Sequence, residues 1–117
     1  MSIVGVAYRK EVWIVDLIFS DSGRTLMLTP GQDICIKLGE NPTTGYRWQV
    51  VGAGDPVLFL TNDSFTLGSS AAVGGGGTRT LQFHTGKTGA ATLRIEYGRP
   101  GVAASVKRVF LLNVRVS

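Results

Sequence analysis

Cys35 and His84 are the chain's one cysteine and one histidine, and together they could form a thiol nucleophile and its base. Alternation of apolar and polar residues places each in mid-strand, facing outward among charged or polar neighbours. A catalytic cysteine sits instead where a loop or helix end lowers the pKa of its thiol. We therefore predict a free surface thiol and a surface imidazole. One cysteine allows no internal disulfide, and one Cys with one His is too few for a zinc site.

Two glycine-containing stretches have the look of nucleotide-binding motifs but fail on spacing. A phosphate-binding loop ending in Gly86-Lys87-Thr88 needs a glycine five residues earlier, where the chain has Leu81. The run Gly74–Gly77 lacks a strand–glycine–helix context, and the later glycine of that motif falls on Arg79. We expect a hairpin turn and a flexible loop. With no catalytic constellation visible, the sequence predicts a binding protein rather than an enzyme, without cofactor or metal.

The bulk composition indicates one small globular domain. The chain has 117 residues, of which 44% are hydrophobic, enough for one core. Its net charge is +4, and no run of basic residues is longer than two. Nucleic-acid-binding proteins usually cluster such charge on one element, so we expect no nucleic-acid partner. The surplus is interpreted as solvation, or as weak steering toward an acidic partner.

An apolar segment near the N-terminus predicts a strand. It runs from Val12 to Phe19 but is interrupted by Asp16, whereas a signal peptide needs an unbroken apolar stretch before its cleavage site. The segment is also too short to span a membrane. We therefore expect no membrane partner, and favour the cytoplasm over a secreted, periplasmic or lysosomal location. Trp13 is expected in the core.

Short runs of Val, Ile, Thr and aromatic residues between Gly, Pro, Asn and Asp predict strands throughout, with no convincing helix. Asp33–Leu38 is the clearest, with Ile34, Ile36 and Leu38 on one face. Strands at this spacing indicate an all-β protein, a β-sandwich of about seven to eight strands. The residue ranges expected as strands are 11–20 (apolar on both faces, hence central), 24–28, 33–38, 46–51, 57–60, 64–67, 79–85, 91–97 and 106–116.

Three loops have unusual composition: Gly39–Gly45, Gly68–Gly77 and Gly98–Ser105. In the first, Pro42 fixes its own φ, the two threonines are stiff at χ1, and Gly45 can take positive φ. This uncharged tip has little entropy left to lose on binding and describes a wedge. An ordinary connection between strands is the alternative. Loops on a rigid scaffold are where binding residues concentrate.

The order of three motifs resembles the chagasin family, which are protein inhibitors of papain-like cysteine peptidases. The motifs are "NPTTGY" (41–46), a glycine-rich loop ending in "GGT" (76–78), and "RP" (99–100) after an apolar strand ending in Tyr97. The similarity extends from about Val15 to Val116, which leaves residues 1–14 as an extension or extra strand and 15–117 as the inhibitor domain.

The resemblance implies an immunoglobulin-like sandwich with three binding loops at one end. It also implies a reversible, competitive inhibitor, with papain-like cysteine peptidases as partners. The first loop would block the active-site cleft, and the other two would grip it from either side. Carried over to this chain, the wedge is Asn41, Pro42, Thr43, Thr44 and Gly45; one flank is Val73, Gly74, Gly75, Gly76 and Gly77, with Ala72 beside it; the other flank is Arg99, Pro100 and Gly101.

One position departs from the family pattern. The family usually has Trp directly after Arg-Pro, whereas this chain has Gly101. The glycine removes a large aromatic anchor from the third loop, unless the loop backbone requires positive φ there.

Tyr46 and Trp48 are two apart and share one side of their strand, so both are expected to pack in the core, with a role for Tyr46 in shaping the base of the loop as the alternative. A non-inhibitory β-sandwich module for adhesion or carbohydrate binding is the alternative function. Such a module would more often show exposed aromatic rings or a calcium-binding acidic cluster, and neither is evident. The chain is expected to be a monomer in which long loops permit domain swapping.

Overall fold

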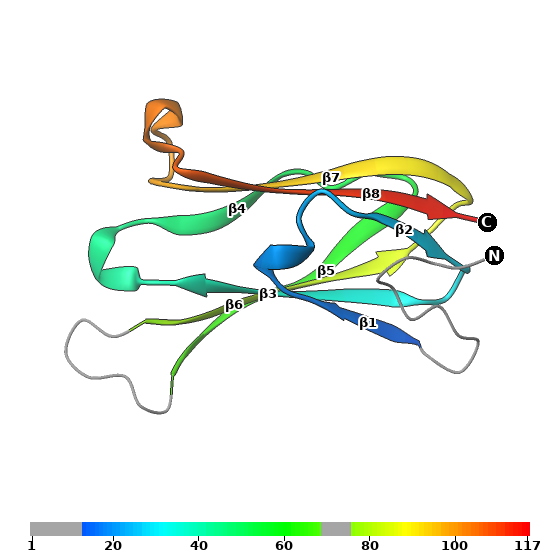
Figure 1. The fold of residues 1–117 in the computed structure, drawn as a ribbon, viewed down its shortest axis with the longest axis horizontal. Helices are drawn as coiled ribbons and strands as arrows, with labels where there is room; N and C mark the ends of the chain where they lie inside the picture. The colour runs from blue at the N-terminus through cyan, green and yellow to red at the C-terminus, as the bar shows by residue number, and fades with distance from the viewer. Residues whose placement is uncertain (1–12, 69–75) are drawn as a thin grey trace.

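The described part of the protein, residues 13–68 and 76–117 of a computed structural model, folds into two four-stranded sheets packed face to face (Figure 1). The first sheet has the order β1-β3-β6-β5 and the second β2-β8-β7-β4. β1 pairs with β3, and β2 with β8, in parallel; the other neighbours are antiparallel. The strands are β1 Ile14–Leu17, β2 Thr25–Leu28, β3 Asp33–Glu40, β4 Arg47–Gly52, β5 Leu58–Leu67, β6 Gly77–Thr85, β7 Gly89–Gly98 and β8 Arg108–Val116.

This arrangement confirms the predicted all-β sandwich. The described helices are 3₁₀ turns of three residues at Phe19–Asp21, Pro42–Thr44 and Ala103–Ser105. None of them is long or apolar enough to cross a membrane. The predicted boundary between residues 14 and 15 stays a prediction, because residues 1–12 lie outside the described part of the chain.

The core lies between the sheets and follows directly from strand alternation. In β3 the side chains of Ile34, Ile36 and Leu38 point inward and are at most 1% exposed. Phe83 on β6 and Phe110 on β8 fill the centre and are fully buried. Removing such apolar surface from water contributes about 25 cal/mol for each Å² and is the main force that holds the two sheets together.

The N-terminal strand differs from the prediction of a central strand over residues 11–20. β1 has four residues, lies at the edge of its sheet, and alternates, with only Val15 and Leu17 buried. It ends because the Asp21 carboxylate accepts a hydrogen bond from the Ile18 backbone N–H at 2.9 Å and the chain turns into a 3₁₀ helix. Trp13, expected in the core, precedes β1 and is 58% exposed.

The predicted strands 57–60 and 64–67 form one strand, β5. The intervening Thr61–Asp63 has a turn-like composition, but its backbone pairs with β6 through Gln82 and Leu81. A register shift between Leu60 and Asn62 absorbs the irregularity as a β-bulge. β5 is an edge strand, so its polar side chains stay in solvent while the backbone completes the ladder.

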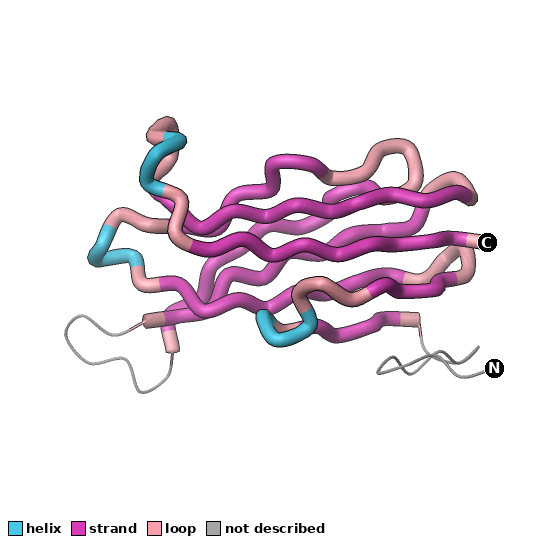
Figure 2. The backbone as a smooth tube through the Cα atoms, turned by 45° about the horizontal axis from the view of Figure 1, so that its top comes forward, coloured by secondary structure: helices cyan, strands magenta, loops and turns pink. Residues whose placement is uncertain are grey.

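One end of the sandwich carries the connections of unusual composition. The β3–β4 and β7–β8 connections both lie at the left end in Figures 1 and 2, where β5 also ends and β6 begins. β8 starts at this end, here called the loop end, and runs the length of its sheet to Ser117 at the opposite end. The strands therefore act as a stiff frame that holds these connections side by side.

Cys35 lies on the outer face of β3, as alternation predicts, but it is not the surface thiol that we expected. It is only 9% exposed, because β3 is an inner strand and Cys35 lies between Asp16 of β1 and Gln82 of β6. Burial, then the nearby Asp16 carboxylate, raises the pKa of the thiol, and Lys37 partly opposes this.

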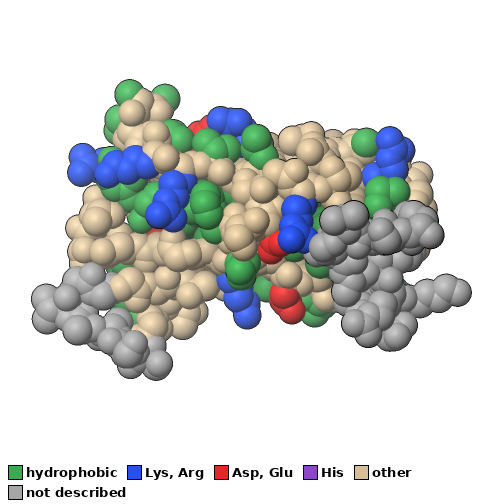
Figure 3. All heavy atoms as spheres, in the orientation of Figure 1, with side chains coloured by type: hydrophobic (Ala, Val, Ile, Leu, Met, Phe, Trp, Pro, Cys, Tyr) green, Lys and Arg blue, Asp and Glu red, His purple; other side chains and the backbone are tan. Residues whose placement is uncertain are grey.

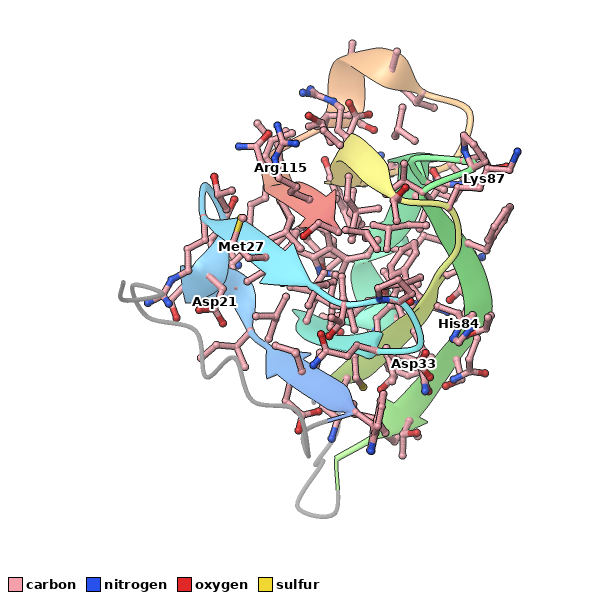
Figure 4. All side chains as sticks on the ribbon, turned by 90° about the vertical axis from the view of Figure 1, so that its right-hand side faces the viewer. Asp21, Met27, Asp33, His84, Lys87 and Arg115 are labelled. Carbon is pink, nitrogen blue, oxygen red and sulfur yellow. The ribbon has the colours of Figure 1, made fainter. Side chains whose placement is uncertain are left out.

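His84 is exposed, as predicted, and its Nδ1 lies 2.5 Å from Asp33 Oδ1 (Figure 4). The ring therefore pairs with a carboxylate on the neighbouring strand. No hydrogen bond joins it to Cys35 among the residues that the structure describes. The two side chains do not form a nucleophile and base.

We predict that the Cys35 thiol of the folded protein reacts slowly with an aromatic disulfide reagent. Because its pKa is raised, the reactive thiolate should appear only at higher pH than for a free cysteine. The measurement is the labelling rate against pH, with the chain unfolded in denaturant as the control. Equal rates for the folded and unfolded chains would contradict a buried thiol.

Candidate functional site

The β3–β4 loop is a compact turn stabilised by its own side chains. Asn41 precedes a 3₁₀ turn over Pro42–Thr44, and Gly45 ends it with φ 77°. The Asn41 side-chain oxygen accepts hydrogen bonds from the Thr43 N–H (3.1 Å) and hydroxyl (2.7 Å). The Thr44 hydroxyl donates to the Asn41 carbonyl at 2.8 Å. Pro42, Thr43, Thr44 and Gly45 are all exposed. The stiffness predicted from the residue types is thus reinforced by hydrogen bonds.

Both stems of this loop are fixed to the framework. The Asn41 N–H donates to the Tyr97 hydroxyl of β7 at 3.3 Å. On the other stem, Trp48 is 1% exposed, and its indole Nε1–H donates to the Gly39 carbonyl at 2.8 Å. The core position predicted for Trp48 is therefore confirmed, and the indole also ties the end of the loop back to its beginning.

A buried ion pair lies beneath the loop. Glu40 and Arg79 stand on the core-facing sides of β3 and β6, next in phase after the apolar residues Leu38 and Leu81, and are 5% and 8% exposed. Arg79 Nη2 and Nε donate to the two Glu40 carboxylate oxygens at 2.6 and 3.1 Å. This bidentate geometry is the strong form of such a pair. The hydrogen bonds raise the pKa of Arg79, although burial opposes this.

The same carboxylate joins the two sheets. Glu40 Oε1 also accepts the backbone N–H of Trp48, in the second sheet, at 2.8 Å. Arg79 in turn donates Nη1 to Asp63 of β5 at 3.0 Å and stacks over the Phe65 ring, 5.5 Å from its centroid. Neither buried charge is left unpaired, which is the condition for tolerating charges inside a core.

The β7–β8 loop begins with a tight turn that requires glycine. The Val102 N–H donates to the Arg99 carbonyl at 3.0 Å, with Pro100 second and Gly101 third in the turn. Gly101 has φ 79°. Proline followed by a residue with positive φ is the signature of a type II turn. Gly101 is therefore a backbone requirement, and Val102, 50% exposed, is the apolar side chain that the loop presents.

Tyr46 links the first and third loops. Two cations contact its ring: Arg99 Cζ is 5.2 Å and Lys107 Nζ 4.4 Å from the centroid. Its centroid is also 5.6 Å from that of Tyr97. Tyr46 is only partly buried, so the core position predicted for it is wrong. The ring instead lies between the loops and holds Arg99 beside the base of the Asn41–Gly45 turn.

The second loop is described only at its stems. Val73, Gly74, Gly75 and their neighbour Ala72 lie outside the described residues. At Gly76 an added Cβ would come within 3.3 Å of the Glu40 carbonyl, and at Gly77 within 2.3 Å of the Thr66 carbonyl. Both glycines therefore let β6 pass close to its neighbours. The stem of the second loop thus lies directly against that of the first.

The structure brings these predicted residues around shared surface hollows. Pro42 and Gly45 of the first loop face Pro100 of the third across a hollow that Phe65 and Arg79 also line. A neighbouring hollow lies between Asn41 and Gly76, with Lys107 along it. Among the described residues, no group of three His, Cys, Asp or Glu side chains could hold a metal ion. The arrangement is a rigid, mostly uncharged protrusion with a flank, and suits contact with another macromolecule.

Comparison with known proteins places the chain in a family. Residues 27–114 match the model of the Chagasin family peptidase inhibitor I42. Chagasin from Trypanosoma cruzi is 27% identical over 88 residues, which are 72% of this chain and 80% of that protein. Because the family model matches most of the chain, the protein belongs to the chagasin family of peptidase inhibitors.

Solved structures agree with this assignment. The cysteine protease inhibitor EhICP2 from Entamoeba histolytica is 26% identical with a TM-score of 0.80, and the match covers 89% of this chain and 96% of that one. Amebosin is 27% identical with a TM-score of 0.73, covering 89% and 97%. Both likenesses extend over nearly the whole fold and confirm the family resemblance seen in the three motifs.

Sequence reasoning missed four residues at this site: Glu40, Arg79, Tyr97 and Lys107. The alternation of β3 could have revealed Glu40. Ile34, Ile36 and Leu38 point into the core, and Glu40 is the next residue on the same face, so the pattern places a charged side chain on the core side. Arg79 likewise shares its phase with Leu81 and Phe83. Two opposite charges on core-facing positions of paired strands indicate a buried pair. Tyr97 was noted only as the end of an apolar strand before Arg99-Pro100, with no role of its own, and Lys107 carried no comparable signal.

We predict that Glu40→Gln lowers the free energy of unfolding by about 3 kcal/mol, because Arg79 is left buried without its bidentate partner. Asp63→Asn is the matched control, and should cost less than about 1 kcal/mol because Asp63 is partly exposed. Urea unfolding of both variants beside the parent measures the difference. Equal losses would mean that the Glu40 pair is not the dominant contact.

At Gly101 we expect Gly101→Ala to destabilise the chain by about 1 kcal/mol, because an L side chain is disfavoured at φ 79°. Gly101→Asn should cost less, since asparagine tolerates this region better. The family tryptophan at this position would meet the same strain. Thermal unfolding of the two variants tests the turn, and an alanine variant as stable as the parent would refute it.

Proposed function

We propose that this chain is a reversible, competitive inhibitor of papain-like cysteine peptidases that acts by occlusion and catalyses no reaction. Its wedge is Asn41, Pro42, Thr43, Thr44 and Gly45, with Arg99, Pro100 and Gly101 on one side and the 73–77 segment on the other. The observation that carries this proposal is the exposed 3₁₀ turn of the β3–β4 loop, held by hydrogen bonds from its own asparagine and threonines.

The wedge is suited to enter a narrow cleft. It bears no charge, so its burial requires no charged group to lose water. Its side chains are already fixed by hydrogen bonds, so little conformational freedom is lost on binding. Because the chain is wound into a 3₁₀ turn rather than extended, it fills the cleft without presenting a peptide bond in the extended form of a substrate.

The flanks would set the angle at which the wedge enters. Arg99 lies over Tyr46, directly after the wedge, so this contact joins the third loop to the wedge. Gly76, at the stem of the second loop, lies against the Glu40 carbonyl at the stem of the first. Because the wedge and the third loop are already ordered, little conformational freedom in these two loops is lost on binding.

We predict that Thr43→Asp weakens inhibition of papain by about 100-fold, because it buries an unpaired carboxylate worth about 3 kcal/mol in the interface. The measurement is the inhibition constant, after circular dichroism confirms the fold.

Two further variants isolate the cause of the loss. Thr43→Val removes the hydroxyl bond to Asn41 without adding charge, and should weaken inhibition far less. Thr88→Asp adds the same charge to the exposed β6–β7 turn and should leave inhibition unchanged. If Thr43→Asp inhibits as well as the parent, Thr43 does not enter the cleft.

A further inference from the structure

Four basic residues that are scattered in the sequence come together at the loop end. Arg47 follows the wedge at the start of β4, and Arg99 opens the third loop. Lys107 and Arg108 lead into β8 and line the hollow beside Asn41 and Gly76. Figure 3 shows Lys and Arg side chains at this end of the molecule, as well as elsewhere on the same face, and all four residues are exposed.

These cations have no carboxylate partner among the described residues. Arg99 and Lys107 contact the Tyr46 ring, Arg108 lies over the Phe19 ring, and no ion pair involves any of the four. Cations held against aromatic faces keep their charge and remain available to a partner.

The acidic groups of this end are already engaged. Glu40 and Asp63 both bind Arg79, so that buried group carries one net negative charge. Glu96 lines a hollow with Arg99 but pairs with Arg94 at 2.8 Å. The three loop sequences add no other acidic residue, since 39–45 holds only Glu40, and 68–77 and 98–105 hold none. The loop end therefore presents unpaired positive charge around an uncharged wedge.

We infer that this cationic rim (Arg47, Arg99, Lys107 and Arg108) selects papain-like peptidases whose active-site cleft is bordered by acidic side chains, and steers them onto the wedge. The inference rests on the proposed function, because it assumes that the wedge enters a peptidase cleft. Exposed charges at the border of an interface act mainly on the association rate, and their effect falls as salt screens them. Contact energy from the wedge would then set the dissociation rate.

The test compares charge reversal at the two ends of the sandwich. Arg47→Glu/Lys107→Glu reverses two charges of the cationic rim. Lys87→Glu/Arg115→Glu makes the same change in net charge at the opposite end, where Figure 4 shows both side chains. Association and dissociation rates are measured by stopped flow at low and high salt. Two papain-like peptidases serve as probes, one with an acidic and one with a basic cleft border.

With the acidic-bordered peptidase at low salt, the rim variant should associate about tenfold more slowly than the parent, and the difference should shrink at high salt. With the basic-bordered peptidase the rim variant should associate faster than the parent. The opposite-end variant should follow the parent in both cases. Dissociation rates should change by less than about twofold.

The single variant Arg47→Glu guards against a disturbance at Tyr46, because Arg47 makes no ring contact or ion pair among the described residues. It should show the same salt-dependent slowing at smaller size. If every variant inhibits with the parent's association rate at all salt concentrations, the inference is wrong and the proposed function stands. If the parent itself inhibits neither peptidase, the proposed function fails instead.

Discussion

The contact on which the loop end depends is the buried ion pair between Glu40 and Arg79. The apolar core ends at this point, and the next inward-facing side chains are a carboxylate and a guanidinium that bind each other. Because Glu40 also accepts the Trp48 N–H, one carboxylate fixes the start of the wedge loop, its end, and the spacing of the two sheets. A cation on β6 thereby controls the geometry of a loop that it does not belong to.

The apolar core and the loops that we propose for recognition occupy separate parts of the molecule. The core of aliphatic and aromatic side chains lies along the sandwich, and the β3–β4 and β7–β8 loops, which we propose for recognition, lie beyond its charged end. Within the wedge nearly all order is local, from one asparagine and two threonines bonding to their own backbone. Between loops it comes from the Tyr46 ring and its two cations. The shape of the wedge therefore depends on its own residue types, and the frame beneath it fixes only where the wedge stands.

Sequence alternation predicted the two-sheet fold because the inner strands each carry a buried and an exposed face, as β3 does. It failed where position within a sheet matters. Apolar residues around β1 have the same pattern at the edge of a sheet as at its centre. The Thr61–Asp63 stretch of β5 pairs through its backbone, which residue composition does not reveal. Alternation also gave the face of Cys35 but not the neighbouring strands that bury it.

For the site, residue types alone predicted the stiff wedge, whereas contacts between distant positions required the fold. Glu40 and Arg79 are 39 positions apart, and Asn41 and Tyr97 are 56 apart. The direction of β8 has a practical consequence. Its nine residues extend about 30 Å from the loop end, so Ser117 lies at the opposite end of the sandwich. A tether, tag or solid support attached there would leave the wedge pointing outward, and several copies on one scaffold could each engage a target.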